Sequence, residues 1–332
     1  MIKSIVRKFA AVSLACVMCG SLARAAENDL PPLTERPVLR LHAAEISTAA
    51  VNVRLLGASR AGRRLVAVGD HGVVLLSDDD GRSFRQARRV PVDSTLTSVS
   101  FSDSKNGWAV GHWGVIIRTE DGGETWTLQR SDLQVDQPLF AVHFADSKRG
   151  WAVGLWSLML HTDDGGANWS VVRIPPPPGA KKADRNFYSI FANDKGALYV
   201  ACEQGLVLRS KDEGATWTYA ATGYSGSFWT GIALHDGTLL VGGLHGTVFR
   251  SADGGDTWEH VQTPYKSSIT GFAQDAPGTI VSSSLDGVVL NSTDDGASFT
   301  GEQKSDREAL TAVIDTSVGK PLLLSVSGIV KQ

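Results

Sequence analysis

The sequence predicts an all-β chain folded as a seven-bladed β-propeller. Three observations carry this prediction: a short turn motif occurs six times, its copies follow at a nearly constant spacing, and each copy lies among four short strand-like runs. A repeat of about 43 residues with four strands is typical of a propeller blade. The 307 residues after position 25 have room for seven such repeats.

The repeated motif reads [ST]-x-D-x-G-x-x-[WF], and its aspartates are 42, 43, 48, 41 and 41 residues apart. The carboxylate can accept backbone N–H groups of its own turn, the glycine permits a positive φ, and the aromatic ring can fold back over the turn. We therefore expect each copy to brace a hairpin within its blade. The six structural aspartates are Asp79, Asp121, Asp164, Asp212, Asp253 and Asp294.

The strand-like runs repeat around each motif, and the last repeat is incomplete. One full repeat has runs at 96–101, 107–111, 114–119 and 125–128. The last repeat lacks the motif and has three runs, at 310–314, 322–325 and 328–331. We expect residues 37–41 to supply its fourth strand, so that the N- and C-terminal strands close the ring. A closed ring leaves few exposed strand edges.

The first residues have the pattern of a secretory signal peptide. Three basic residues precede an apolar stretch at 9–22, and an A-x-A cleavage site ends at Ala25. We expect 1–25 to be a cleaved leader, 26–49 an N-terminal segment that includes the closing strand, and 50–332 the propeller. The mature protein is then expected in the periplasm or outside the cell. Cys16 and Cys19 lie in a poor lipobox, which leaves lipidation open.

Composition excludes several classes of protein. With 42% hydrophobic residues, 20% charged residues and 35 glycines, the chain is neither disordered nor a coiled coil. Removal of the leader takes away four basic and no acidic residues, which moves the net charge from −3 to −7. Nonspecific binding of nucleic acid is therefore not expected. The one cysteine left, Cys202, lies in a strand-like run and is expected to be a buried, inert thiol.

The six motif copies are Asp-boxes, also called bacterial neuraminidase repeats. Gly-Trp-Ala-Val-Gly at 107–111 and 150–154, combined with Asp-Gly-Gly-Glu-Thr-Trp at 121–126, resembles the photosystem II stability/assembly factor family. The resemblance covers residues 50–330. It implies an exported, non-enzymatic factor without a cofactor, whose client is a membrane-embedded or membrane-associated protein. That client would be a photosystem II subunit precursor in a phototroph, or a transporter complex otherwise. We expect a monomer.

A sialidase-like or other glycan-binding or glycoside-hydrolysing propeller is the alternative, because sialidases also carry Asp-boxes. They have a Phe/Tyr-Arg-Ile-Pro motif before the first box, whereas Val172-Arg173-Ile174-Pro175 follows the third box here. A glycosidase also needs two opposed carboxylates or a Tyr–Glu pair. We therefore predict no catalytic residue. The boxes lack the ligand layout of a calcium loop, and we predict no metal site.

The turn between the second and third strands of most blades is a Gly-x-x-Gly-like tetrad. In a propeller these turns lie on one face and ring the mouth of the channel. Exposed aromatic residues are enriched in interface hot spots, so a recognition face is favoured over a plain solvated rim. The candidate binding residues are His71, His112, Trp113, Trp156, Gln204, Trp229, His245 and Asp286, and Ser327 is the equivalent residue of the last repeat.

Two further features favour binding of a protein. The longest connection, residues 174–186, is rich in proline and carries Lys181, Lys182 and Arg185. Such loops vary without disturbing the scaffold. The first repeat is rich in arginine, and the resemblance implies that such a cluster contacts the client, although ordinary surface charge is the alternative. The predicted basic patch consists of Arg60, Arg63, Arg64, Arg85, Arg88 and Arg89, with Arg82 nearby.

Overall fold

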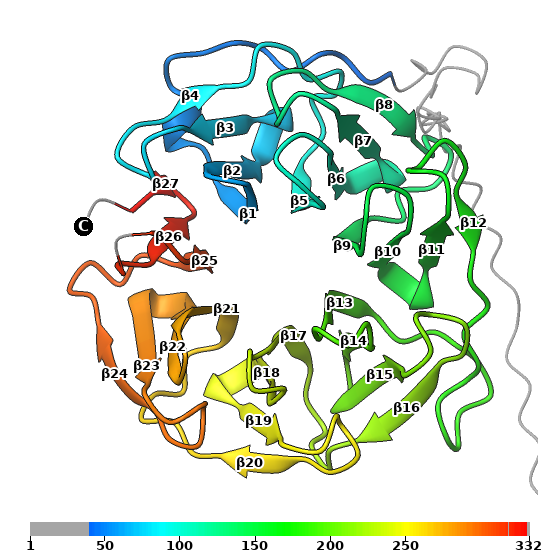
Figure 1. Cartoon of the computed structure of the whole chain (residues 1–332), viewed down its shortest axis with the longest axis vertical. Helices are drawn as coiled ribbons and strands as arrows, with labels where there is room; N and C mark the ends of the chain where they lie inside the picture. Colours follow the sequence, from blue (N-terminus) through cyan, green and yellow to red (C-terminus); the bar gives the residue numbers. More distant parts are fainter. Residues whose placement is uncertain (1–39, 318, 331–332) are drawn as a thin grey trace, which may run out of the picture. The chain divides into compact units, whose positions relative to one another are not determined.

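The computed structural model describes residues 40–317 and 319–330. Within these ranges the chain forms seven antiparallel sheets that follow one another around a ring, with the first strand of each sheet nearest the centre (Figure 1). The remaining regular structure described consists of one-turn 3-10 helices. The fold is the predicted seven-bladed β-propeller. Among the described residues we find no helix with the length and hydropathy needed to cross a membrane.

The strands of blades one to three are β1 (Leu55–Ala61), β2 (Arg64–Gly69), β3 (Val74–Ser77), β4 (Arg85–Gln86), β5 (Leu96–Phe101), β6 (Gly107–Gly111), β7 (Ile116–Thr119), β8 (Thr127–Arg130), β9 (Leu139–Phe144), β10 (Gly150–Gly154), β11 (Met159–Thr162) and β12 (Ser170–Val171). Those of blades four and five are β13 (Phe187–Ala192), β14 (Leu198–Cys202), β15 (Leu206–Ser210), β16 (Thr218–Ala221), β17 (Phe228–Ala233), β18 (Leu239–Gly243), β19 (Val248–Ser251) and β20 (Glu259–Val261).

Blade six contains β21 (Ile269–Ala276), β22 (Thr279–Ser284), β23 (Val288–Ser292) and β24 (Thr300–Gln303), and blade seven contains β25 (Leu310–Ile314), β26 (Leu322–Ser325) and β27 (Gly328–Ile329). The 3-10 turns are η2 (Ala50–Asn52), η3 (Asp70–Gly72), η4 (His112–Gly114), η5 (Leu155–Ser157), η6 (Leu244–Gly246) and η7 (Leu285–Gly287).

The hydrophobic core lies between neighbouring blades. Every residue of β6 and β10, the two Gly-Trp-Ala-Val-Gly strands, is buried. The Trp108 ring stacks on Phe144 of the next blade, with the ring centroids 3.5 Å apart and the planes 5° from parallel. Its indole N–H donates to the carbonyl of Gly165 at 3.0 Å, in the turn motif of that next blade. This tryptophan therefore joins two blades through both packing and a hydrogen bond.

Each of the six repeated turns forms the same set of hydrogen bonds within itself. In the third copy, Oδ1 of Asp164 accepts the Thr162 hydroxyl at 2.9 Å and the backbone N–H of Asn168 at 2.9 Å. Its Oδ2 accepts the side-chain amide of Asn168 at 2.8 Å. The N–H of Gly166, whose φ is 85°, donates to the Thr162 hydroxyl at 2.8 Å. Equivalent bonds form around the other five aspartates.

These hydrogen bonds stabilise the charged form of each aspartate. Donors on Asn168, the side-chain amide first and then the backbone N–H, lower the pKa of Asp164 to about 2. Ser83 and Thr216 donate in the same way and lower the pKa of Asp79 and Asp212 to about 2. The carboxylates serve their own turns, and this is the local bracing role that the motif predicts.

The ring closes where blade seven meets blade one. There β25 lies beside β1, and the Thr311 hydroxyl donates to the carbonyl of Leu55 at 2.6 Å. Of the closing strand predicted at 37–41, residues 37–39 lie outside the described residues, and residues 40 and 41 are not in a strand. Leu41 packs against the core between blades one and two. The predicted fourth strand of blade seven is therefore not confirmed.

Of two further predictions, the structure does not test the leader and confirms the buried thiol. Residues 1–25, the predicted leader, lie outside the described residues. Cys202 is fully buried at the end of β14 and is free, as expected. Burial raises the pKa of its thiol, which favours the unreactive protonated form.

Candidate functional site

The turns between second and third strands all lie on one face, because the strands of each blade alternate in direction. We call this the rim face; it also carries the connections between blades. Each turn is hydrogen-bonded to the residue that precedes the first strand of its own blade. The N–H of His112 donates to the carbonyl of Thr95 at 3.1 Å, and that of Leu155 donates to Pro138 at 3.1 Å. The rim turns and the connections therefore form one layer.

Close backbone contact explains the first glycine of the tetrads. A Cβ atom on Gly154 would lie 2.1 Å from the carbonyl oxygen of Pro138, and one on Gly111 would lie 2.0 Å from that of Thr95. No side chain fits there without moving the backbone. The glycines of the sequence pattern are thus required by the contact between turn and connection.

The third residue of the tetrad has a left-handed backbone in six blades. For a bulky residue this conformation is uncommon and costs about 1–2 kcal/mol. The two tryptophans are the least expected occupants. The residues and their φ angles are His71 57°, Trp113 58°, Trp156 56°, Gln204 60°, His245 57° and Asp286 59°.

Trp156 is the exposed tryptophan of the rim face, with 56% of its surface accessible. Its backbone N–H donates to Oδ1 of Asn186 at 3.0 Å. The next residue, Ser157, donates its N–H to the carbonyl of Arg185 at 2.7 Å. The proline-rich connection predicted as a binding arm therefore ends by holding the turn that presents Trp156.

Trp113 is held in the same way but is half-buried. Its N–H donates to Oδ1 of Asp136 at 2.8 Å, and Nδ1 of His112 lies 3.1 Å from the other oxygen of that carboxylate. The indole packs against the core between blades one and two. No ring contact joins Trp113 to Trp156 in the described part of the chain. The two tryptophans are therefore not equivalent, and Trp156 is the better exposed of the two.

A position that sequence reasoning found in only one blade, as the predicted binding residue Trp229, lies next to these turns. The first strand of every blade has a β-bulge after its first residue, opposite the tetrad. In three blades the bulged residue is a threonine whose hydroxyl donates to the first strand of the next blade. Thr97 donates to Leu139 at 2.7 Å, and Thr270 donates to Leu310 at 3.0 Å. In these three blades the position joins neighbouring blades.

Three successive blades have an aromatic residue at the bulge instead: Phe140, Tyr188 and Trp229, all half-buried. The Phe140 and Tyr188 rings stack with centroids 5.6 Å apart and planes 21° from parallel. The side-chain amide of Asn186 donates to the Tyr188 hydroxyl at 3.5 Å, and so links this stack to the Trp156 turn. We call Phe140, Trp156, Tyr188 and Trp229 the aromatic cluster. Trp156 and Trp229 were predicted as binding residues; comparing the second residues of all first strands would also have revealed Phe140 and Tyr188.

The other predicted rim residues are exposed but more scattered. His71 lines a hollow of about 430 Å³ together with His42 and Asp93. Asp286 lies 3.7 Å from Arg307. Gln204, His245 and Ser327 are exposed at their turns. In the described part of the chain, no group of three or more His, Cys, Asp or Glu side chains is placed to hold a metal ion.

The predicted basic patch lies on the opposite face, with the repeated turns, and much of its charge is compensated. Glu124 of the neighbouring blade accepts from Arg85 at 2.9 Å and lies 3.4 Å from Arg88. The Arg85 hydrogen bond is the main reason that the pKa of Glu124 is lowered. The remaining ion pairs of the patch are Arg60 with Asp80 and Asp315, Arg64 with Asp78 and Glu124, and Arg85 with Asp78.

Comparison with known proteins agrees with the sequence resemblance. The family model of the photosynthesis system II assembly factor YCF48 matches residues 86–240. Over this range, a little under half of its length, the chain is similar to photosystem II assembly factors. The matched range includes the rim turns of blades two to four and all three aromatic bulge residues. No curated protein matches the sequence.

Solved structures confirm the propeller fold. YCF48 bound to D1 peptide is 19% identical, with a TM-score of 0.69, and the match covers 88% of this chain and 97% of that one. YCF48 from Cyanidioschyzon merolae is 15% identical, with a TM-score of 0.66 and coverages of 87% and 97%. Virginiamycin B lyase from Staphylococcus aureus is 10% identical, with a TM-score of 0.68 and the same coverages. A lyase shares the fold, so function must be argued from the site.

Proposed function

We propose that this chain is an exported, non-enzymatic assembly factor that binds a segment of a membrane-protein client on its rim face. The YCF48 family match and the structure of YCF48 with D1 peptide support a protein client. In a phototrophic host the client would be a photosystem II subunit; otherwise it would belong to another membrane complex, such as a transporter. Neither a cofactor nor a nucleic acid enters this proposal, and the factor acts as a monomer.

The aromatic cluster is the observation that carries the proposal. Three successive blades carry an aromatic ring where three others carry a threonine that joins blades, and a fourth ring, Trp156, is exposed on a strained turn. Aromatic side chains provide large contact areas at low cost in conformational entropy, and they dominate interface hot spots. The rigid blades hold the rings in place, so little ordering is needed on binding.

In-cell photocrosslinking tests this function. A photoreactive residue at Trp156 should give one dominant membrane-protein adduct, identified by mass spectrometry. The matched control is the same residue at Ser104, which is exposed on the opposite face. Equal adducts from both positions, or none from Trp156, would contradict client binding at the rim.

Export is tested separately. The mature protein should be recovered from the periplasm or the medium with Ala26 as its first residue. Retention in the cytoplasm would overturn this part of the proposal. A lipid attached to Cys16 or Cys19 would overturn cleavage at Ala25 while leaving export intact.

A glycoside hydrolase is the less favoured function. The candidate rim acid, Asp286, is exposed and lies beside Arg307, and Arg173 of the Val-Arg-Ile-Pro run is an exposed residue of the connection after the third blade. A glycosidase needs two carboxyl groups about 5–9.5 Å apart flanking the scissile bond. Release of sugar from sialosides or xyloglucan by the purified protein would reinstate the enzyme.

A further inference from the structure

The outer edge of blade seven differs from that of the other blades. In six blades the third strand is covered by a fourth strand, whereas β27 is the last strand described in blade seven. The N–H of Val330 donates to the carbonyl of Leu323 at 3.0 Å, and Ile329 lies opposite Leu324. Because ladder bonds alternate along an antiparallel pair, the N–H and C=O of Ile329 face away from β26. This edge can therefore accept another strand.

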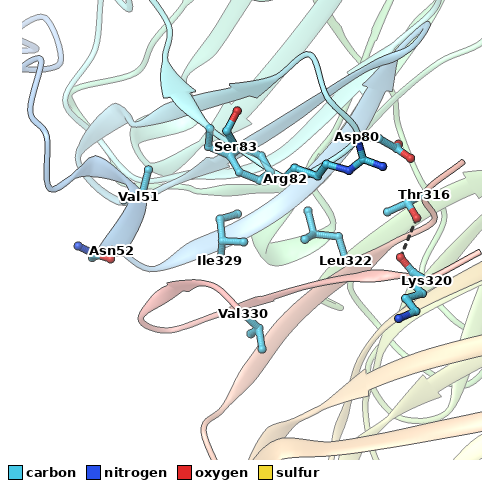
Figure 2. A pocket seen from close by; sticks show the side chains of 12 residues that line it. Val51, Asn52, Asp80, Arg82, Ser83, Thr316, Lys320, Leu322, Ile329 and Val330 are labelled. Carbon is cyan, nitrogen blue, oxygen red and sulfur yellow. Dashed lines mark hydrogen bonds between the residues drawn. The ribbon is translucent and has the colours of Figure 1, made fainter. Parts of the chain in front are cut away.

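A hollow of about 620 Å³ lies beside this edge, between blades seven and one. Figure 2 shows Val51, Leu322 and Ile329 around it. Phe84 of blade one and Val330 also line it. Its size is within the range of roughly 300–1,000 Å³ found for ligand sites, and its lining is largely apolar.

Uncompensated positive charge borders the hollow. Arg82 and Lys320 both line it and are exposed, and no carboxylate of the described residues lies within ion-pair distance of either. Asp80, the acid in the lining, is already engaged: it lies 3.1 Å from Arg60 and accepts the N–H of Ser317 at 2.8 Å. The free charges of Arg82 and Lys320 favour a ligand with an acidic side chain.

The described N-terminal segment does not occupy the edge position. The N–H of Ala44 donates to Val90 at 3.0 Å, so this part of the segment lies along blade one. It meets blade seven at Val51, whose carbonyl oxygen would be 2.0 Å from a Cβ atom on Gly328. That contact lies beside the hollow. Among the described residues, no fourth strand pairs with the outward N–H and C=O groups of Ile329.

We propose that the β27 edge binds an extended segment of a partner protein, which adds as the fourth strand of blade seven. The partner strand places an apolar side chain between Phe84, Leu322 and Ile329, and an acidic side chain on the same face next to Arg82 and Lys320. Strand addition gives affinity through the backbone and specificity through alternate side chains. This site is separate from the aromatic cluster and does not depend on the function proposed for the rim.

Binding of a synthetic strand tests the site. The probe is a fluorescein-labelled heptapeptide, Thr-Asp-Thr-Leu-Thr-Val-Thr, whose Asp, Leu and Val share one face, and the readout is fluorescence anisotropy with the full-length protein. We expect saturable binding that weakens at least tenfold in the Arg82→Glu, Lys320→Glu double variant. A probe with Lys in place of Asp should show the reverse preference, which separates charge recognition from misfolding.

N-methylation of the probe tests strand addition on the unaltered protein. Methylation of single amides should abolish binding at alternate positions, because alternate N–H groups point to the protein edge. The Trp156→Ala variant should bind the probe as the wild type does, so a failure of the rim function would leave this result intact.

Three outcomes would overturn the proposal. One is absence of binding at millimolar probe. Another is an N-methyl scan without alternation. The third is binding that appears only after deletion of residues 26–39, which would assign the edge to the chain's own N-terminal segment.

Discussion

Asn186 accepts the backbone N–H of Trp156 through its side-chain oxygen at 3.0 Å, and Asp136 does the same for Trp113 at 2.8 Å. Each partner belongs to the connection that leads into the next blade. The connection thus fixes the turn that carries the tryptophan. Variation in a connecting loop can therefore alter what the rim presents while the blades stay unchanged.

Replacing Asn186 with alanine should weaken client binding more than it weakens the fold. The variant loses the bond to Trp156 and the two bonds that its amide group donates, to the Glu203 carboxylate at 3.2 Å and to the Tyr188 hydroxyl at 3.5 Å. We expect a loss of about 1 kcal/mol in the free energy of unfolding and roughly a tenfold loss in client affinity, because a misplaced anchor costs more than one hydrogen bond. Urea unfolding and crosslinking yield measure the two effects.

The matched control for this variant is Asn193→Ala on the opposite face. Asn193 also accepts two backbone N–H groups, those of Lys195 at 3.1 Å and Ala197 at 3.0 Å. It should show a similar loss of stability with unchanged client binding. Equal losses of binding in both variants would show that Asn186 acts only through the fold.

Glycine at position 156 should not destabilise the protein. The left-handed φ of 56° costs a non-glycine residue about 1–2 kcal/mol, whereas glycine costs about 0.5–1 kcal/mol of extra chain entropy. Because the Trp156 ring is 56% exposed, little packing is lost. Trp156→Gly should therefore be neutral or more stable by up to about 1 kcal/mol in urea unfolding.

The contrasting variant is Trp113→Gly. It relieves a similar φ of 58° but removes a ring that packs against the core, so we expect a net loss of about 2 kcal/mol. If both variants lost the same stability, the Trp156 ring would be packed in solution.

Features set by local sequence could be predicted, and the tetrads show why. The close approach of Gly154 to Pro138 and the bracing of Asp164 by Asn168 depend on residues within one repeat. Because the same local pattern recurs in each repeat, it predicts the same blade seven times and hence the ring. Alignment of the repeats also located the third tetrad position, and the structure shows that its backbone is left-handed in six blades.

Features set by contacts between blades could not be predicted. The compensation of Arg85 by Glu124 joins residues 39 positions apart, and the burial of Trp113 depends on the core of two blades. The β-bulge that places Tyr188 beside Asn186 cannot be recognised from the pattern of apolar and polar residues along β13. The position of Leu41 against blade one also depends on how the segment lies on the folded ring.

Removing the carboxylate of one repeated turn should affect stability alone. Asp164→Ala leaves the Thr162 hydroxyl and both Asn168 donors without their acceptor, so we expect a loss of about 1–3 kcal/mol in urea unfolding. Client binding per folded molecule should be unchanged. The neighbouring Asp163→Ala removes the same charge from an exposed position and should be nearly neutral. Loss of binding without loss of stability would give Asp164 a direct role in recognition.

Acid should destabilise the propeller through these same turns. Hydrogen bonds from Ser83, Asn168 and Thr216 lower the pKa of Asp79, Asp164 and Asp212 to about 2, against 3.8 for a free aspartate. Because the folded pKa lies below the unfolded one, the stabilisation is complete above about pH 4 and is lost as the pH falls toward 2. The urea midpoint, measured at intervals from pH 6 to pH 2, should therefore fall most steeply below pH 4. Asp164→Asn should reduce that slope, since one titrating group is gone, and an unchanged slope would show that these carboxylates do not control acid unfolding.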